Sequence, residues 1–69
     1  MKETTKLSVP VWEKMMLTVD EAALYSNIGV NKIREMCDEP MCPFVLYVGR
    51  KRLIKRKAFE EYINIREEI

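Results

Sequence analysis

The sequence predicts a small α+β domain, and three observations lead to this fold class. Two short helical patterns follow one another across a tight turn between residues 18 and 40. Aromatic and β-branched residues at 44–48 are followed by a glycine and a second apolar segment at 52–54, which is typical of a hairpin. Helical spacing then returns from residue 55 onwards. With 69 residues, the chain has room for one domain with a thin core.

The segment before the first helix is expected to add one strand to the sheet. Residues 1–8 are polar, so we expect a flexible N-terminus and a single domain at 9–69. Pro10 has no backbone N–H, so a strand near it should lie at a sheet edge. Trp12 is expected to anchor the core rather than to serve as a platform for a ligand.

The strongest helix signals surround a turn at 26–29, which reads SNIG. Thr18 and Glu21 form a capping box, in which each side chain accepts a hydrogen bond from the backbone N–H of the other residue. Asn27 tolerates the left-handed conformation that ends a helix, and Gly29 is an acceptable N-cap for a second helix. This spacing is typical of a helix-turn-helix, whose second helix enters the DNA major groove.

The second helix is expected to have an inner and an outer face. Its inner residues are Ile33, Met36 and Cys37, and its outer residues are Asn31, Lys32, Arg34 and Glu35. Asparagine pairs well with adenine, and arginine or lysine with guanine, so the outer face suits base recognition. The spacing alone fits an ordinary helical hairpin with a solvated outer face equally well.

A basic run with the sequence GRKRLIKRK occupies residues 49–57. It holds six of the 12 basic residues and none of the 11 acidic residues, in a chain of net charge +1. Basic residues can also protect a sheet edge, occur in turns or keep a protein soluble. Charges of both signs serve these roles as well, so none of them accounts for a run of one sign. We interpret it as a contact to a nucleic-acid backbone, with the acidic remainder of the surface orienting the approach.

The basic run divides between a hairpin and the start of the last helix. The hairpin loop has either two residues in a type II′ turn or a longer form, and the sequence leaves both open. At a helix start the dipole disfavours each cation by about 0.3–1 kcal/mol, whereas beside a phosphate the cations and the helix amides act together. The order strand, helix, helix, hairpin, helix is that of a winged helix-turn-helix. The expected wing residues are Arg50, Lys51 and Arg52, and the expected phosphate contacts are Thr18, Lys55, Arg56 and Lys57.

Composition argues against several classes of function. The chain has no histidine and only two cysteines, too few ligands for a structural zinc site, and it lacks a glycine-rich phosphate loop. We therefore expect no metal, no cofactor, no small-molecule substrate and no catalysis. A membrane span and a signal peptide are not evident, so a cytoplasmic, nucleoid-associated protein is expected. Cys37 and Cys42 are expected to be buried or half-buried thiols rather than a disulfide.

Two stretches also resemble a known family. LTVDEAALYSNIGVNKIREM at 17–36 and VGRKRLIKRKAFEEYI at 48–63 resemble the small excisionases of conjugative transposons, within the excisionase-like, MerR-related winged helices. The narrower match rests on the strings PVW, IG.NK and IKRK at 10–12, 28–32 and 54–57. The resemblance covers residues 10–65, which is nearly the whole chain.

The resemblance implies an architectural role without catalysis. Proteins of this family bind double-stranded DNA near the ends of a mobile element, bend it, and help a tyrosine-recombinase integrase to assemble an excision complex. Gly29 and Val30 stand where the broader group often has serine and arginine, so base specificity does not carry over. Self-association on adjacent DNA sites is a further expectation. The alternatives are a transcriptional regulator of the same fold, or an interaction module whose last helix docks on the integrase.

Overall fold

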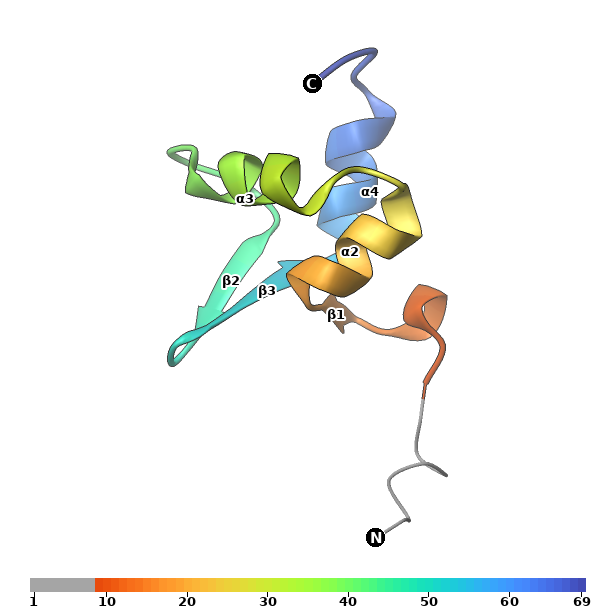
Figure 1. The fold of residues 1–69 in the computed structure, drawn as a ribbon, viewed down its shortest axis with the longest axis vertical. Coiled ribbons are helices and arrows are strands. Elements are labelled where there is room, and N and C mark those ends of the chain that lie inside the picture. The colour runs from red at the N-terminus through yellow and green to blue at the C-terminus, as the bar shows by residue number, and fades with distance from the viewer. Residues whose placement is uncertain (1–8) are drawn as a thin grey trace, which may run out of the picture.

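The computed structural model describes residues 9–69, and the predicted flexible segment at 1–8 lies outside the described residues. In chain order the elements are a 3-10 helix η1 (Val11–Glu13), β1 (Met16–Leu17), α2 (Val19–Ser26), α3 (Val30–Asp38), β2 (Val45–Val48), β3 (Lys51–Lys55) and α4 (Arg56–Asn64) (Figure 1). Three α-helices and a three-stranded antiparallel sheet make up the α+β winged helix-turn-helix that the sequence predicts. Among the described helices, none is long and apolar enough to cross a bilayer.

Helices α2 and α3 form the helix-turn-helix, and the predicted caps are present. Thr18 Oγ1 accepts a hydrogen bond from the Glu21 N–H at 3.1 Å, and Glu21 Oε1 accepts one from the Thr18 N–H at 3.0 Å. Asn27 ends α2 in the left-handed conformation, with φ of 64°. Gly29 is the N-cap of α3, which begins at Val30. Local chemistry therefore accounts for both helix boundaries at the turn.

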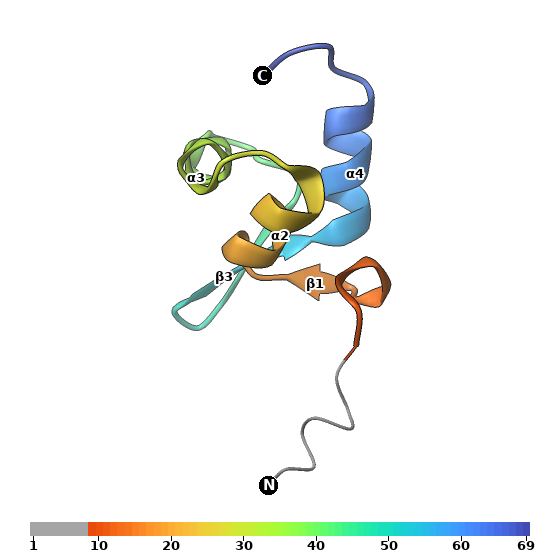
Figure 2. The same cartoon turned by 45° about the vertical axis from the view of Figure 1, so that its right-hand side comes forward.

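The sheet has β3 at its centre, with β1 and β2 at the two edges. The edge position expected for a strand near Pro10 is confirmed, although β1 is only two residues long. β2 and β3 pair up to Val48 and Lys51, so the hairpin loop consists of Gly49 and Arg50. Gly49 has φ of +62°, whereas Arg50 is not among the positive-φ residues, which agrees with a type II′ loop. In both ribbon views the tip of this hairpin projects away from the helices (Figures 1 and 2).

One apolar core joins the sheet to the three α-helices. Phe44 meets the rings of Phe59 and Tyr62 edge-on, with centroids 5.1 and 5.0 Å apart. The predicted inner face of α3 is confirmed, because Ile33, Met36 and Cys37 are all buried. The buried residues are Leu17, Ala22, Ile33, Met36, Cys37, Phe44, Ile54 and Phe59. This core holds α3 and the hairpin in a fixed relation to each other.

The segment before β1 differs from the expectation. Val11–Glu13 form the 3-10 helix η1, so the strand begins only at Met16. Successive side chains of a 3-10 helix point about 120° apart. Because Val11 packs against the core, its neighbour Trp12 points to solvent and is 63% exposed. The prediction that Trp12 anchors the core is therefore wrong.

Candidate nucleic-acid interface

The outer face of α3 is a polar surface that rests on the buried Ile33. All four predicted outer residues, Asn31, Lys32, Arg34 and Glu35, are exposed. Lys32 Nζ lies 3.6 Å from Glu35 Oε1, an exposed pair of a kind that contributes little to stability. Within the described residues, the side chains of Asn31 and Arg34 make no hydrogen bond, so both can face a ligand.

The β2–β3 hairpin carries the predicted wing residues. Arg50 lies in the two-residue loop and Lys51 begins β3, and both are exposed. Arg52 is more covered, because its Nη2 donates to Asp38 Oδ1 at 3.1 Å and its guanidinium carbon lies 5.7 Å from the centroid of the Tyr47 ring. Asp38 is the last residue of α3, so Arg52 joins the hairpin to this helix.

Strand alternation places the cations of β3 on two faces of the hairpin. Successive side chains of a strand point to opposite faces. Arg52 shares the face of the buried Ile54, whereas Lys51 and Lys55 lie on the opposite face. The fold therefore does not gather the basic run into a single patch.

The start of α4 holds the last three residues of the basic run. Lys55 is the N-cap residue and Lys57 lies in the first turn, and both are exposed. The side chain of Arg56 is only 16% exposed, with Nε donating to the Lys14 carbonyl at 2.6 Å and Nη1 donating to Glu60 Oε2 at 3.1 Å. The sequence argument that the run has no counter-charge thus does not hold for Arg56, since Glu60 lies one helical turn away.

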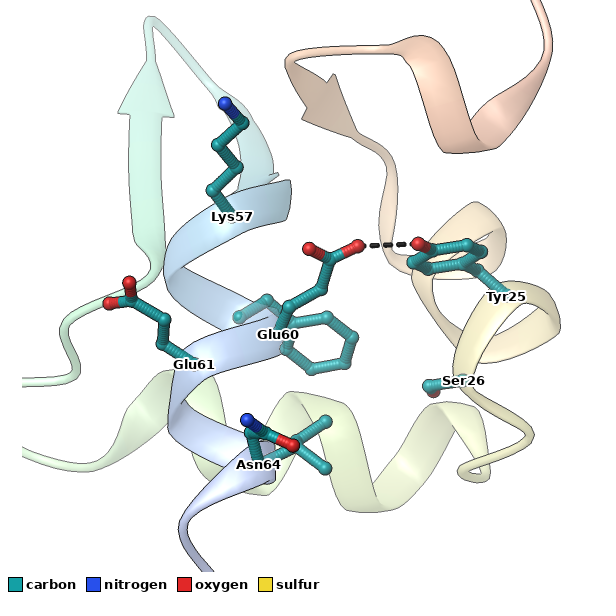
Figure 3. A pocket seen from close by; sticks show the side chains of 8 residues that line it. Tyr25, Ser26, Lys57, Glu60, Glu61 and Asn64 are labelled. Atoms are coloured by element: carbon teal, nitrogen blue, oxygen red, sulfur yellow. Dashed lines mark hydrogen bonds between the residues drawn. The ribbon is translucent and has the colours of Figure 1, made fainter.

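A hollow lies between α2 and α4, lined by polar and apolar side chains (Figure 3). Tyr25 Oη donates a hydrogen bond to Glu60 across this hollow. That bond raises the pKa of Tyr25, and together with the contact from Arg56 it lowers the pKa of Glu60. Glu61 also lines the hollow, beside Lys57. The carboxylates of Glu60 and Glu61 disfavour a phosphate inside the hollow itself.

Thr18 lies at the N-terminus of α2, as expected for a phosphate contact, but its hydroxyl oxygen is engaged in the capping box. Its O–H can still donate a hydrogen bond. The neighbouring Glu21 accepts a hydrogen bond from Lys14, which is the main cause that lowers the pKa of Glu21. An ionised carboxylate beside Thr18 makes this helix start less attractive to a phosphate than the start of α4.

Sequence reasoning missed the side chains that hold the basic residues in place. Glu60 could have been found, because it follows Arg56 at the i,i+4 spacing of helical ion pairs. Tyr47 could also have been found, since it lies opposite Arg52 once the loop has two residues. The contact of Asp38 with Arg52 has no such signal, because it depends on how α3 packs beside the hairpin.

The two thiols and the acidic residues give no sign of a metal site. The described part of the chain contains no group of three or more side chains that could hold a metal ion. Cys37 is buried and Cys42 is half-buried, and both are free thiols, as the sequence predicts. Burial raises the pKa of the Cys37 thiol, which keeps it protonated and unreactive at neutral pH.

Comparison with known proteins identifies the family of the chain. Residues 1–68 match the family described as "Excisionase from transposon Tn916". An excisionase from transposon Tn916 of Streptococcus agalactiae serotype V (strain ATCC BAA-611 / 2603 V/R) is 38% identical over 65 residues, which span 93% of this chain and 92% of the relative. No solved structure matches the chain. The family is non-catalytic, which confirms the expectation that the chain is not an enzyme. The chain belongs to the Tn916 excisionase family, as its resemblance to small excisionases predicts.

Proposed function

We propose that this chain is a recombination directionality factor, which binds DNA near the ends of a mobile element and assists a tyrosine-recombinase integrase in excision. The observation that carries the proposal is the family match over residues 1–68, together with the relative that is named an excisionase. The winged helix-turn-helix supports it, because this fold offers a helix for the major groove and a hairpin for the backbone.

On this proposal, α3 lies in the major groove of the target site. Asn31 and Arg34 are the base-reading residues, because an amide recognises adenine and a guanidinium recognises guanine. Lys32 and Glu35 flank them on the same exposed face. Sequence preference then depends on α3, whereas most of the electrostatic affinity comes from elsewhere.

The hairpin supplies that affinity by following the DNA backbone into the neighbouring minor groove. A hairpin that enters the minor groove lies between two DNA backbones, and each of its faces is directed towards one of them. Arg52 lies on one face and Lys51 and Lys55 lie on the other, so both phosphate strands meet positive charge. Lys55 and Lys57 form the main phosphate contacts at the start of α4, while Arg56 adds its charge from a less exposed position.

The same placement of charge favours a bent DNA. Neutralising phosphates on both sides of the hairpin draws the flanking duplex towards the protein, at a bending cost on the order of 1–6 kcal/mol that added contacts offset. Bending brings distant integrase sites together. Ile65 and Ile69 are 79% and 44% exposed at the end of the chain, and we propose that they contact the integrase or a neighbouring copy on an adjacent site.

A circular-permutation gel assay tests the architectural role. The probe is a set of equal-length duplexes that carry one end of the mobile element at different positions. A DNA-bending protein gives complexes whose mobility depends on the position of the site. Complexes that all migrate alike mean that the DNA stays straight, and the proposal fails in favour of a transcriptional regulator of the same fold.

The dependence of affinity on salt tests the contacts themselves. Six to eight phosphate contacts give a slope of log K against log salt of about −5 to −7. Replacing both Lys55 and Lys57 by Ala should flatten this slope by about 2 and weaken all sequences alike. Arg66→Ala is the control, because Arg66 stacks on Tyr62 at the far end of α4, 3.7 Å from the ring centroid. A slope near zero in the parent protein contradicts DNA binding.

A further inference from the structure

Asp38 occupies a position that helix stability does not explain. It is the last residue of α3, where the helix dipole is negative, and no basic residue lies in the last turn of this helix. Its side chain is 65% exposed, yet its carboxylate is held 3.1 Å from Arg52. So exposed an ion pair contributes little to folding, so stability does not explain the contact of Asp38 with Arg52.

Arg52 is oriented from two sides. Asp38 accepts a hydrogen bond from one of its nitrogens, and the ring of Tyr47 lies opposite Arg52 on the neighbouring strand. A guanidinium group carries five N–H donors in one plane, and the hydrogen bond to Asp38 occupies one of them. The side chain is still 29% exposed, so its remaining donors can reach an anion in solvent.

The ion pair also lies at an informative place in the fold. Among the ion pairs of residues 9–69, that of Asp38 and Arg52 is the one that joins α3 to the hairpin. If α3 lies in the major groove and the hairpin in the adjacent minor groove, one DNA backbone passes between them. The guanidinium of Arg52 lies between the same two elements.

We propose that Asp38 is a positioning residue that holds Arg52 in place to bind one backbone phosphodiester between the groove read by α3 and the groove entered by the hairpin. This inference rests on the proposed function. A guanidinium already held in place loses less conformational freedom on binding than a mobile one. The hydrogen bond to Asp38 fixes the guanidinium of Arg52 relative to α3. Arg52 therefore contacts a phosphate only when that phosphate lies at the right distance from the bases that α3 reads.

Asp38 also weakens contacts between Arg52 and phosphates at other positions on the DNA. Its negative charge reduces the attraction of Arg52 for phosphates in general. Removing the carboxylate therefore has opposite effects on two kinds of DNA. Binding to the matched site loses a positioned contact, while binding to unrelated DNA gains from the removed negative charge.

The experiment compares the affinities of the full chain for two duplexes. One spans an end of the mobile element that carries this gene, and the other is a shuffled duplex of equal length and base composition. Asp38→Ala should lower the ratio of the two affinities about tenfold, as expected for one charged hydrogen bond. Glu39→Ala is the matched control, because Glu39 is an exposed neighbour that makes no ion pair among residues 9–69. It should raise both affinities by the same factor.

A second comparison separates positioning from folding. In an Arg52→Ala background, Asp38→Ala should change the affinity ratio no more than Glu39→Ala does, because the residue that it positions is gone. The inference is overturned if Asp38→Ala alone behaves like Glu39→Ala. It is also overturned if Asp38→Ala weakens both duplexes equally along with a lower melting temperature. If the parent protein binds both duplexes alike, the proposed function itself fails; if only the Asp38 result fails, the proposed function stands.

Discussion

At the scale of the residue, Trp12 and Phe59 show that a large aromatic side chain can lie either in solvent or in the core. Trp12 is 63% exposed, whereas Phe59 is 1% exposed and in contact with the ring of Phe44. We expect Trp12→Ala to change the free energy of unfolding by less than about 0.5 kcal/mol. Phe59→Ala should lower it by about 3–5 kcal/mol, because it leaves a cavity in a thin core. Urea denaturation followed by far-UV circular dichroism measures both. Equal losses would restore the core-anchor interpretation of Trp12.

Glu21 gives the protein a defined sensitivity to acid. The hydrogen bonds from Lys14 and from the Thr18 N–H hold the pKa of Glu21 below its ordinary value of 4.5. Because the folded-state pKa is lower than the unfolded one, the stabilisation is complete above pH 4.5 and is lost as the pH falls through the folded-state pKa. Stability measured by denaturation should fall below pH 4.5, and less steeply in Glu21→Gln. Lys14→Met should reduce the fall as well. An unchanged profile in both variants contradicts this assignment.

At the scale of the element, the hairpin depends on the positive φ of Gly49 in its loop. An added Cβ would meet no atom within 4 Å, so the cost of a side chain here is conformational rather than steric. Gly49→Ala should lower the free energy of unfolding by about 1 kcal/mol, because a positive φ is unfavourable for a residue with a Cβ. Gly29→Ser is the control: its φ of −61° suits any residue, and serine adds a capping hydroxyl. Hydrogen exchange should show faster exchange in β2 and β3 for Gly49→Ala alone. Faster exchange in the control as well would contradict a local effect.

Elements with local signals could be predicted from the sequence, and those that depend on tertiary packing could not. The capping box located the start of α2, and the spacing of Ile33, Met36 and Cys37 separated the two faces of α3. In contrast, η1 and the exposure of Trp12 depend on how Val11 meets the core. The same division applies to the candidate site. The exposed cations were predicted, and the i,i+4 spacing of Arg56 and Glu60 could have indicated their ion pair. In contrast, the contacts of Arg52 with Asp38 and of Arg56 with the Lys14 carbonyl join separate elements.

At the scale of the whole molecule, Arg56 connects segments that are far apart in the sequence. Its backbone N–H donates to the Met15 carbonyl at 3.0 Å, and its side chain donates to the Lys14 carbonyl and to Glu60. Glu60 in turn accepts a hydrogen bond from Tyr25 of α2. One cation of the basic run therefore holds the segment before β1, α2 and α4 together. The side chains of Lys55 and Lys57, by contrast, form no ion pair among residues 9–69.

This difference gives a prediction that separates folding from DNA binding within three consecutive residues. Arg56→Ala should lower the free energy of unfolding by about 2 kcal/mol, because it removes charge-assisted hydrogen bonds and leaves the Lys14 carbonyl without this partner. Lys55→Ala and Lys57→Ala should leave stability unchanged or raise it by about 0.3–1 kcal/mol, since each removes a cation from the positive end of the α4 dipole. Denaturation measures stability, and a gel-shift titration on element-end DNA measures binding. The two lysine variants should lose affinity while remaining fully folded. Equal losses of stability in all three variants would mean that the lysines serve the fold, and the assignment of Lys55 and Lys57 to phosphate contacts would then be wrong.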